Sequence, residues 1–139
     1  MKQNEPDILC EGQFLVVDDD DDIANAVGGM LRNAGAKVET VSSPEAALEA
    51  MKQQRTDVVI SDLVMHDADG LELMQDVHKL DNTVSVVIMT SHAEPDLAKR
   101  AQDLGASGFL RKPFKANACV NAASEALNIR RAKLGLESC

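Results

Sequence analysis

Four apolar runs in this sequence each end at a charged or hydroxyl side chain. The runs end at Asp18–Asp19, Asp62, Thr90 and Lys112–Pro113. Successive apolar residues without polar alternation are typical of parallel strands that are buried on both faces. Because parallel strands of one sheet end at the same edge, we expect three carboxylates, a hydroxyl and an ammonium group to meet in one crevice there.

Helical periodicity separates these apolar runs from one another. The predicted strands cover residues 13–17, 37–41, 58–61, 85–89 and 108–111. Helices are predicted over about 23–34, 44–54, 71–80 and 96–104, and from 115 onward. This alternation implies right-handed βαβ units, and hence an α/β fold with a doubly wound, five-stranded parallel sheet and five helices. The common strand order for such a sheet is 2-1-3-4-5, with a ligand-binding switch point between the first and third strands.

The chain of 139 residues is the size of one domain. We expect residues 13–130 to form that domain, after a flexible N-terminal extension over 1–12 and before a C-terminal tail or linker stub over 131–139. In the last helix, the small and aliphatic residues predict a buried stripe made of Ala118, Ala122, Ala126 and Ile129.

The charge of the chain limits its partners. A formal net charge of −9 argues against direct binding to nucleic acid or to an anionic membrane surface, because both need a basic patch. The N-terminus has no apolar core long enough for a secretion signal, and no later run approaches the roughly 18 apolar residues of a membrane span. The protein is therefore expected to be cytoplasmic.

Three acidic side chains at one sheet edge would repel one another. At about 4 Å and an effective dielectric constant of about 20, each like-charged pair costs about 4 kcal/mol. A hard divalent cation would offset this repulsion, and Mg²⁺ is commonly held by one or two carboxylates together with phosphate oxygens. Asp18 and Asp19 are therefore candidate metal ligands, and the backbone carbonyl of Val64 is a candidate to complete the coordination.

A carboxylate at this edge can also attack phosphorus and form an aspartyl phosphate. Asp62 is the candidate nucleophile because it follows the strand at the centre of the switch point. Lys112 is expected to pair with Asp62 before the reaction and with phosphoryl oxygens afterwards. The hydroxyl of Thr90 can donate to a phosphoryl oxygen. Transfer of this kind depends on in-line positioning and on neutralising the charge of the phosphoryl oxygens.

Four segments together resemble the receiver domain of two-component response regulators. They are FLVVDDDDDI (14–23), VVISDLVMHDADGLEL (58–73), VVIMTSHAE (86–94) and GASGFLRKPF (105–114). Each motif is weak alone, but all four in this order and spacing are highly specific, and the resemblance covers roughly residues 13–130. It implies the flavodoxin-like form of the predicted fold and a cis peptide bond between Lys112 and Pro113.

The resemblance also implies a function. Asp62 would be phosphorylated by a partner histidine kinase or histidine phosphotransfer protein, with Mg²⁺ (or Mn²⁺) bound by Asp18, Asp19, Asp62 and the Val64 carbonyl. Thr90 and Phe109 would act as switch residues that remodel the surface of the fourth helix, the last strand and the last helix.

The remodelled surface would act on a downstream effector protein or a fused effector domain. Such a domain is not an enzyme with turnover, apart from Mg²⁺-dependent self-phosphorylation and dephosphorylation. It would be a monomer or a phosphorylation-linked dimer.

Two positions are expected to control how long the phosphoryl group survives. Val64 and His92, two residues beyond Asp62 and Thr90, flank the space that a hydrolytic water would use. Because valine cannot hydrogen-bond such a water, we expect slow self-hydrolysis.

An alternative function is an aspartyl-phosphate phosphatase or phosphotransferase that acts on small phosphoesters. Enzymes of the haloacid-dehalogenase type carry a D-x-D string, which Asp18–Asp20 would fit. However, the sequence contains no substrate-capping insertion. If Asp62 were the nucleophile of such an enzyme, the acid would lie two residues later, where this sequence has Val64. A nucleotide- or flavin-binding module is equally disfavoured, because no glycine-rich phosphate loop follows any predicted strand.

Overall fold

The computed structural model describes residues 9–65, 68–91 and 95–136. The helices and strands in these residues are β1 (Gln13–Val17), α1 (Asp21–Asn33), β2 (Lys37–Val41), α2 (Pro44–Gln53), β3 (Val58–Asp62), β4 (Val64–Met65), β5 (Ala68–Asp69), α3 (Gly70–Leu80), β6 (Ser85–Thr90), α4 (Pro95–Asp103), β7 (Gly108–Arg111) and α5 (Ala116–Lys133). Within this described part, no helix is both long enough and apolar enough to cross a lipid bilayer.

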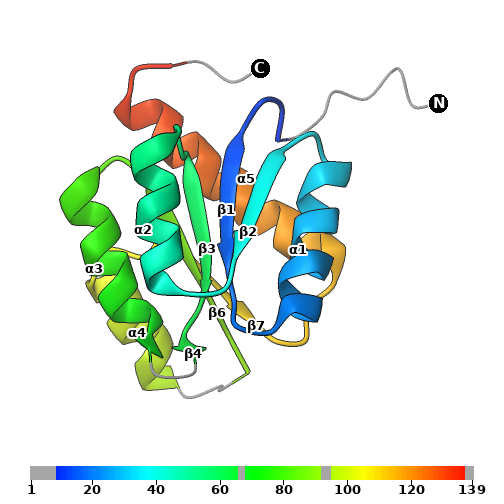
Figure 1. Ribbon diagram of the computed structural model, residues 1–139, viewed down its shortest axis with the longest axis vertical. Helices are drawn as coiled ribbons and strands as arrows, with labels where there is room; N and C mark the ends of the chain where they lie inside the picture. Colours follow the sequence, from blue (N-terminus) through cyan, green and yellow to red (C-terminus); the bar gives the residue numbers. More distant parts are fainter. Residues whose placement is uncertain (1–8, 66–67, 92–94, 137–139) are drawn as a thin grey trace.

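Five strands form one parallel sheet in the order β2-β1-β3-β6-β7 (Figure 1). Numbered along the chain within this sheet, the order is the predicted 2-1-3-4-5, and each strand lies within one residue of its expected bounds. The remaining two strands, β4 and β5, pair with each other as a short antiparallel hairpin. Apolar patterning does not predict this hairpin, since two-residue strands carry too few residues to show a period.

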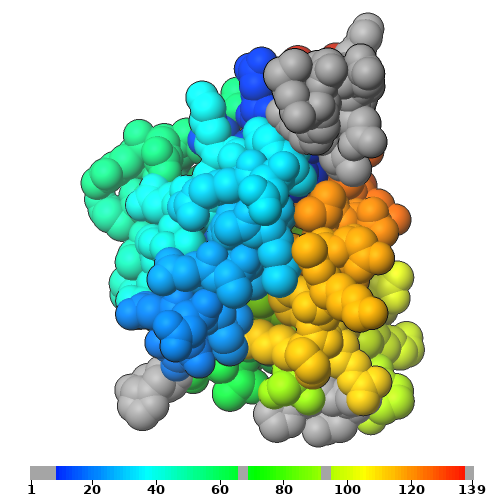
Figure 2. All heavy atoms as spheres, turned by 90° about the vertical axis from the view of Figure 1, so that its right-hand side faces the viewer, coloured from blue at the N-terminus to red at the C-terminus, as the bar shows by residue number. Residues whose placement is uncertain are grey.

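Side chains of the sheet alternate between two hydrophobic layers. Phe14 and Val16 of β1 pack with α1 and α5, whereas Leu15 and Val17 pack with α2, α3 and α4. Figure 1 shows the sheet between these two sets of helices, and Figure 2 shows α1 (blue) and α5 (orange) side by side. Burial on both faces explains why the central strands read as unbroken apolar runs.

Local capping fixes where the helices begin at the carboxyl edge of the sheet. The carboxylate of Asp20 accepts hydrogen bonds from two N–H groups in the first turn of α1. The hydroxyl of Ser43 caps α2, with Pro44 at the first helical position, and Asp69 caps α3. These side chains satisfy N–H groups that would otherwise lack partners at a helix start.

The predicted buried stripe of the last helix is right in part, since Ala126 is buried and Ala122 is half-buried against the core. Ala118 and Ile129 are exposed, and the buried face of α5 is formed by Cys119, Ala123, Ala126, Leu127 and Arg130. The positively charged Arg130 can be buried on this face because it forms ion pairs with Asp57 and Asp81. At the other end of the domain, Leu9 of the expected N-terminal extension is fully buried and donates its N–H to the carbonyl of Ala34.

Candidate functional site

The carboxyl ends of β1, β3 and β6 lie next to one another, as the sequence predicts. The register pairs Val17 with Ser61 and Asp62 with Met89. Asp18 therefore follows β1 beside Asp62, and the last residue of β6 lies on the other side. Three segments that are far apart in the sequence thus contribute to one crevice.

Three carboxylates converge in this crevice. Asp18, Asp19 and Asp62 each place an oxygen so that all three oxygens lie within 4.8 Å of one another. Asp18 is 1% exposed and Asp62 is 9% exposed, while Asp19 lies at the surface. Among the described carboxylates, histidines and cysteines, no other set of three or more brings its ligand atoms this close together. Since Asp19 faces solvent, the crevice is open to a small ion or a phosphoryl group.

Lys112 supplies the positive charge of the site. Its Nζ lies 3.0 Å from Oδ2 of Asp18 and 3.3 Å from Oδ1 of Asp62. The pairing with Asp62 was expected, whereas the pairing with Asp18 was not. The backbone N–H of Lys112 donates to the carbonyl of Thr90 at 2.7 Å, and the Lys112–Pro113 peptide bond is cis. The lysine backbone is therefore held against the end of β6.

The surroundings of Asp62 raise its pKa more than the Lys112 ammonium lowers it. Burial raises the pKa of the Asp62 carboxyl above its ordinary value, the Lys112 ammonium opposes that rise, and the Asp18 and Asp19 carboxylates add to it. One ammonium thus does not compensate burial together with two neighbouring carboxylates. A further cation at this place would lower the pKa of the Asp62 carboxyl.

Two residues that were not predicted to belong to the site hold its aspartates in place. The N–H of Asp20 donates to Oδ1 of Asp18 at 2.9 Å, so the chain turns back on the carboxylate before α1 begins. Gly70, the first residue of α3, lies against the backbone of Asp62, where a Cβ would come within 2.4 Å of the Asp62 carbonyl oxygen. Any larger residue at position 70 would push α3 away from the strand that carries Asp62. The Asp-Gly pair before a predicted helix indicates a turn, but not this close approach.

The other predicted site residues lie at different depths. Thr90 is buried at the end of β6, and Phe109 is half-buried on β7, where it packs against the cluster of α2, α3 and α4. Val64 follows the nucleophile candidate by two residues, with 56% of its surface exposed. His92 lies outside the described residues.

The donor set fits a hard divalent cation. Three carboxylate oxygens converge without a thiolate or imidazole in the group, and oxygen-only coordination is what Mg²⁺ and Mn²⁺ prefer. Burial and the neighbouring carboxylates raise the pKa of Asp62, and such an ion would act against that rise. The same arrangement leaves Asp62 beside an ammonium group, which is the setting in which a carboxylate can accept a phosphoryl group.

Comparison with known proteins adds independent findings. A family profile described as "Response regulator receiver domain" matches residues 14–124. The chain is 35% identical over 122 residues to the C4-dicarboxylate transport transcriptional regulatory protein DctD of Pseudomonas aeruginosa, across 88% of this chain and 26% of that protein. It is 34% identical over 120 residues to the DNA-binding transcriptional regulator NtrC of Escherichia coli, across 86% of this chain and 26% of NtrC. The chain thus spans about a quarter of the length of these curated relatives.

Solved structures agree with the fold. A response regulator receiver domain protein from Clostridium thermocellum superposes with a TM-score of 0.81 at 31% identity, covering 90% of this chain and 99% of that one. The chemotaxis protein CheY4 of Vibrio cholerae superposes with a TM-score of 0.80 at 28% identity, covering 85% of this chain and 100% of that one.

Proposed function

The chain belongs to the response regulator receiver domain family, and we propose that Asp62 is the residue that carries its phosphoryl group. The observation that supports this assignment is the position of Asp62 at the end of the central strand. There its carboxylate lies 3.3 Å from the Lys112 ammonium and within 4.8 Å of the Asp18 and Asp19 oxygens. Asp62 is thus flanked by a cation and by two potential metal ligands.

In the proposed reaction, an Asp62 oxygen attacks the phosphorus of a phosphohistidine on a partner protein. A bond from carboxylate oxygen to phosphorus forms while the phosphorus–nitrogen bond breaks, and the electron pair leaves with the imidazole. Lys112 neutralises charge on the phosphoryl oxygens, and the Thr90 hydroxyl donates a hydrogen bond to one of them. A divalent cation held by Asp18, Asp19, Asp62 and the Val64 carbonyl would supply further charge neutralisation when bound.

The phosphorylated domain would signal through a change of surface. Thr90 and Phe109 lie on neighbouring strands, because the register of β6 and β7 pairs Ile88 with Phe109 and Thr90 with Arg111. A shift of Thr90 toward the phosphoryl group would open space for Phe109 to turn inward, and this would change the face made by α4, β7 and α5. The partner upstream is a histidine kinase or phosphotransfer protein, and the partner downstream is an effector, separate or fused.

The phosphatase alternative is disfavoured by the position of Asp20. In a D-x-D enzyme, the second aspartate acts as the acid toward the leaving group. Here the Asp20 carboxylate is the N-cap of α1 and accepts from the N–H groups of Asp22 and Ile23 at 3.0 and 3.2 Å. An aspartate engaged by its own helix is poorly placed for acid catalysis on a substrate.

Incubation with acetyl phosphate tests the proposal. In the presence of Mg²⁺ or Mn²⁺, we expect the intact protein to gain the mass of a single phosphoryl group, and peptide mapping to place it on Asp62. Removing divalent cations with EDTA should slow this uptake by about tenfold or more, because Lys112 alone then opposes the repulsion among the site carboxylates and the phosphoryl oxygens. Modification of another residue, or uptake that is insensitive to EDTA, would contradict the assignment.

The Val64→Asn variant is expected to lose its phosphoryl group about five to ten times faster than the unaltered protein. Asparagine can hydrogen-bond an attacking water, and one such bond corresponds to roughly this factor in rate. Because Val64 is largely exposed, the substitution should not disturb the fold. The rate is measured as loss of the phosphorylated mass after removal of acetyl phosphate.

The matched control for this prediction is Val64→Ala. Alanine keeps the backbone carbonyl but cannot bind a water through its side chain, so its rate should stay close to that of the unaltered protein. Equal rates for the asparagine and alanine variants would show that residue 64 does not control hydrolysis.

A further inference from the structure

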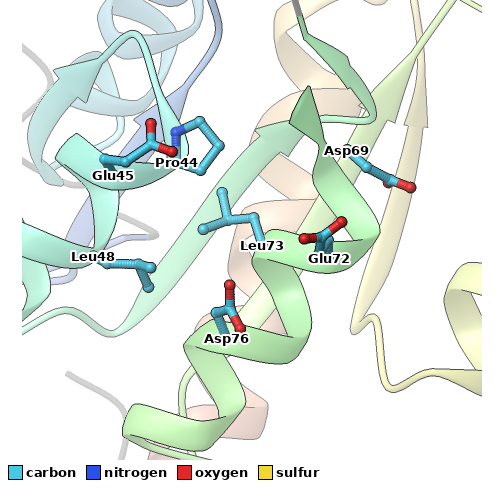
Figure 3. A pocket seen from close by; sticks show the side chains of 7 residues that line it. All are labelled: Pro44, Glu45, Leu48, Asp69, Glu72, Leu73 and Asp76. Carbon is cyan, nitrogen blue, oxygen red and sulfur yellow. The ribbon is translucent and has the colours of Figure 1, made fainter. Parts of the chain in front are cut away.

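A groove of about 330 Å³ lies between α2 and α3, and its lining includes none of the proposed phosphorylation-site residues (Figure 3). Its floor is apolar and is formed by Pro44, Leu48 and Leu73. Figure 3 shows Leu48 and Leu73 pointing toward each other from the two helices. Leu73 is 1% exposed and belongs to the buried cluster under α2, α3 and α4, and the half-buried Leu48 packs against that cluster.

Acidic residues form the walls of this groove. Glu45 projects from α2, and Asp69, Glu72 and Asp76 come from the start and first turns of α3. The residues lining the groove, all in the described part of the chain, include no lysine, arginine or histidine. Favourable placement near helix N-termini accounts for Glu45, Asp69 and Glu72. It does not account for Asp76, which lies more than a turn further along α3.

No three carboxylates of this groove bring their oxygens together at one point. The described residues contain one group of three carboxylates whose oxygens converge within 4.8 Å, and that group is Asp18, Asp19 and Asp62. Within the groove, Asp69 is already engaged as the cap of α3 through the N–H of Leu71. The spacing therefore suits several separate cationic groups better than one ion.

We propose that the groove docks an amphipathic helix of a partner protein that carries lysine or arginine on both sides of an aliphatic stripe. Glu72 and Asp76 are four residues apart on α3, so their side chains lie on one face about 5–6 Å apart. Two basic residues with the same spacing on the partner helix would match them. A third basic residue would face Glu45 on α2, while an aliphatic side chain covers Pro44 and Leu48, the half-buried apolar residues of the groove.

Charge and apolar surface are complementary in this arrangement. Each exposed ion pair contributes little alone, but three pairs around a shared apolar contact correspond to about tenfold in affinity. One groove carboxylate, Asp76, pairs with Lys79, whose Nζ lies 3.8 Å from Oδ1 of Asp76 in a largely exposed pair. An incoming basic side chain can displace so weak a contact.

A fluorescein-labelled helical peptide of leucine and lysine, with lysines four residues apart on both sides of a leucine stripe, serves as the probe. Its binding to the unphosphorylated protein is measured by fluorescence anisotropy, so the result does not depend on the role of Asp62. The triple variant Glu45→Gln, Glu72→Gln, Asp76→Asn should bind the peptide about tenfold more weakly. A peptide in which serine replaces leucine should also bind more weakly, since it cannot cover the floor.

A second triple variant removes the same charge elsewhere, through Asp96→Asn, Asp103→Asn and Glu125→Gln on α4 and α5. These residues are exposed, and their loss should weaken binding less than about threefold because distant charges are screened by salt. Methyl signals of Leu48 and Leu73 should shift in NMR spectra as the peptide is added. Equal losses in the two variants, unshifted methyl signals, or no measurable binding by the unaltered protein would each overturn the proposal.

Discussion

The Asp62→Asn variant is expected to take up no phosphoryl group from acetyl phosphate, while it keeps the fold of the unaltered protein. The amide of asparagine has no anionic oxygen to attack phosphorus, so no acyl phosphate can form at this position. The fold should survive because Lys112 keeps its 3.0 Å contact with Asp18. The substitution also removes one of three converging negative charges, which relieves part of the repulsion between them.

Intact mass spectrometry measures the uptake, and thermal unfolding followed by circular dichroism measures the fold. Asp103→Asn is the matched control, because it makes the same chemical change at an exposed position on α4 and should take up the phosphoryl group normally. Uptake by Asp62→Asn to the level of this control would show that another carboxylate is the acceptor. A modification mapped to Asp18 in that case would favour the phosphatase alternative.

The bounds of the sheet could be predicted because its strands are buried on both faces. All five residues of β3 are buried; the strand begins with the apolar run 58–60, and its end is marked by the first charged residue, Asp62. Parallel strand order then brings the ends of β1, β3 and β6 together with no further information. For this reason, the convergence of Asp18, Asp19 and Asp62 follows from the sequence alone.

The contacts that support the site could not be predicted in the same way. The approach of Gly70 to the Asp62 carbonyl depends on how α3 packs against the loop after β3, and a single glycine does not reveal that packing. The bond from the N–H of Asp20 to Asp18 depends on a local turn within a run of five aspartates that look equivalent in sequence. The backbone path shows that Asp20, rather than Asp21 or Asp22, is the N-cap of α1.

The buried face of α5 was mispredicted in part for a related reason. An apolar stripe is a good guide to burial only when every buried position is apolar, and Arg130 breaks that rule with 5% of its surface exposed. Its partner Asp57 is 73 residues away in the sequence, and no local pattern links the two. The true stripe, which includes Cys119 and Ala123, is rotated by about one residue from the predicted one.

The Arg130→Ala variant is expected to lose about 3–5 kcal/mol of unfolding free energy. The guanidinium places Nε 3.2 Å from Oδ1 of Asp57 and Nη1 3.2 Å from Oδ2 of Asp81, and Nη1 also donates to the Thr83 hydroxyl. Asp57 is 5% exposed, so removing the arginine leaves a buried carboxylate whose remaining charged partner is the largely exposed Arg55. Breaking a buried ion pair from one side carries a penalty of this size. Urea unfolding at neutral pH measures the change.

Two further variants separate the lost ion pair from a general effect on the helix. Lys133→Ala removes an exposed cation from the same end of α5 and should change the unfolding free energy by less than about 1 kcal/mol. Adding Asp57→Asn to Arg130→Ala should restore part of the loss, because the unpaired charge is then gone, although the amide is a poorer acceptor for the N–H of Gln13. The effects of Arg130→Ala and Asp57→Asn on the unfolding free energy could instead be simply additive. In that case the ion pair between Arg130 and Asp57 would contribute nothing to stability, and α5 would be held by its apolar face alone.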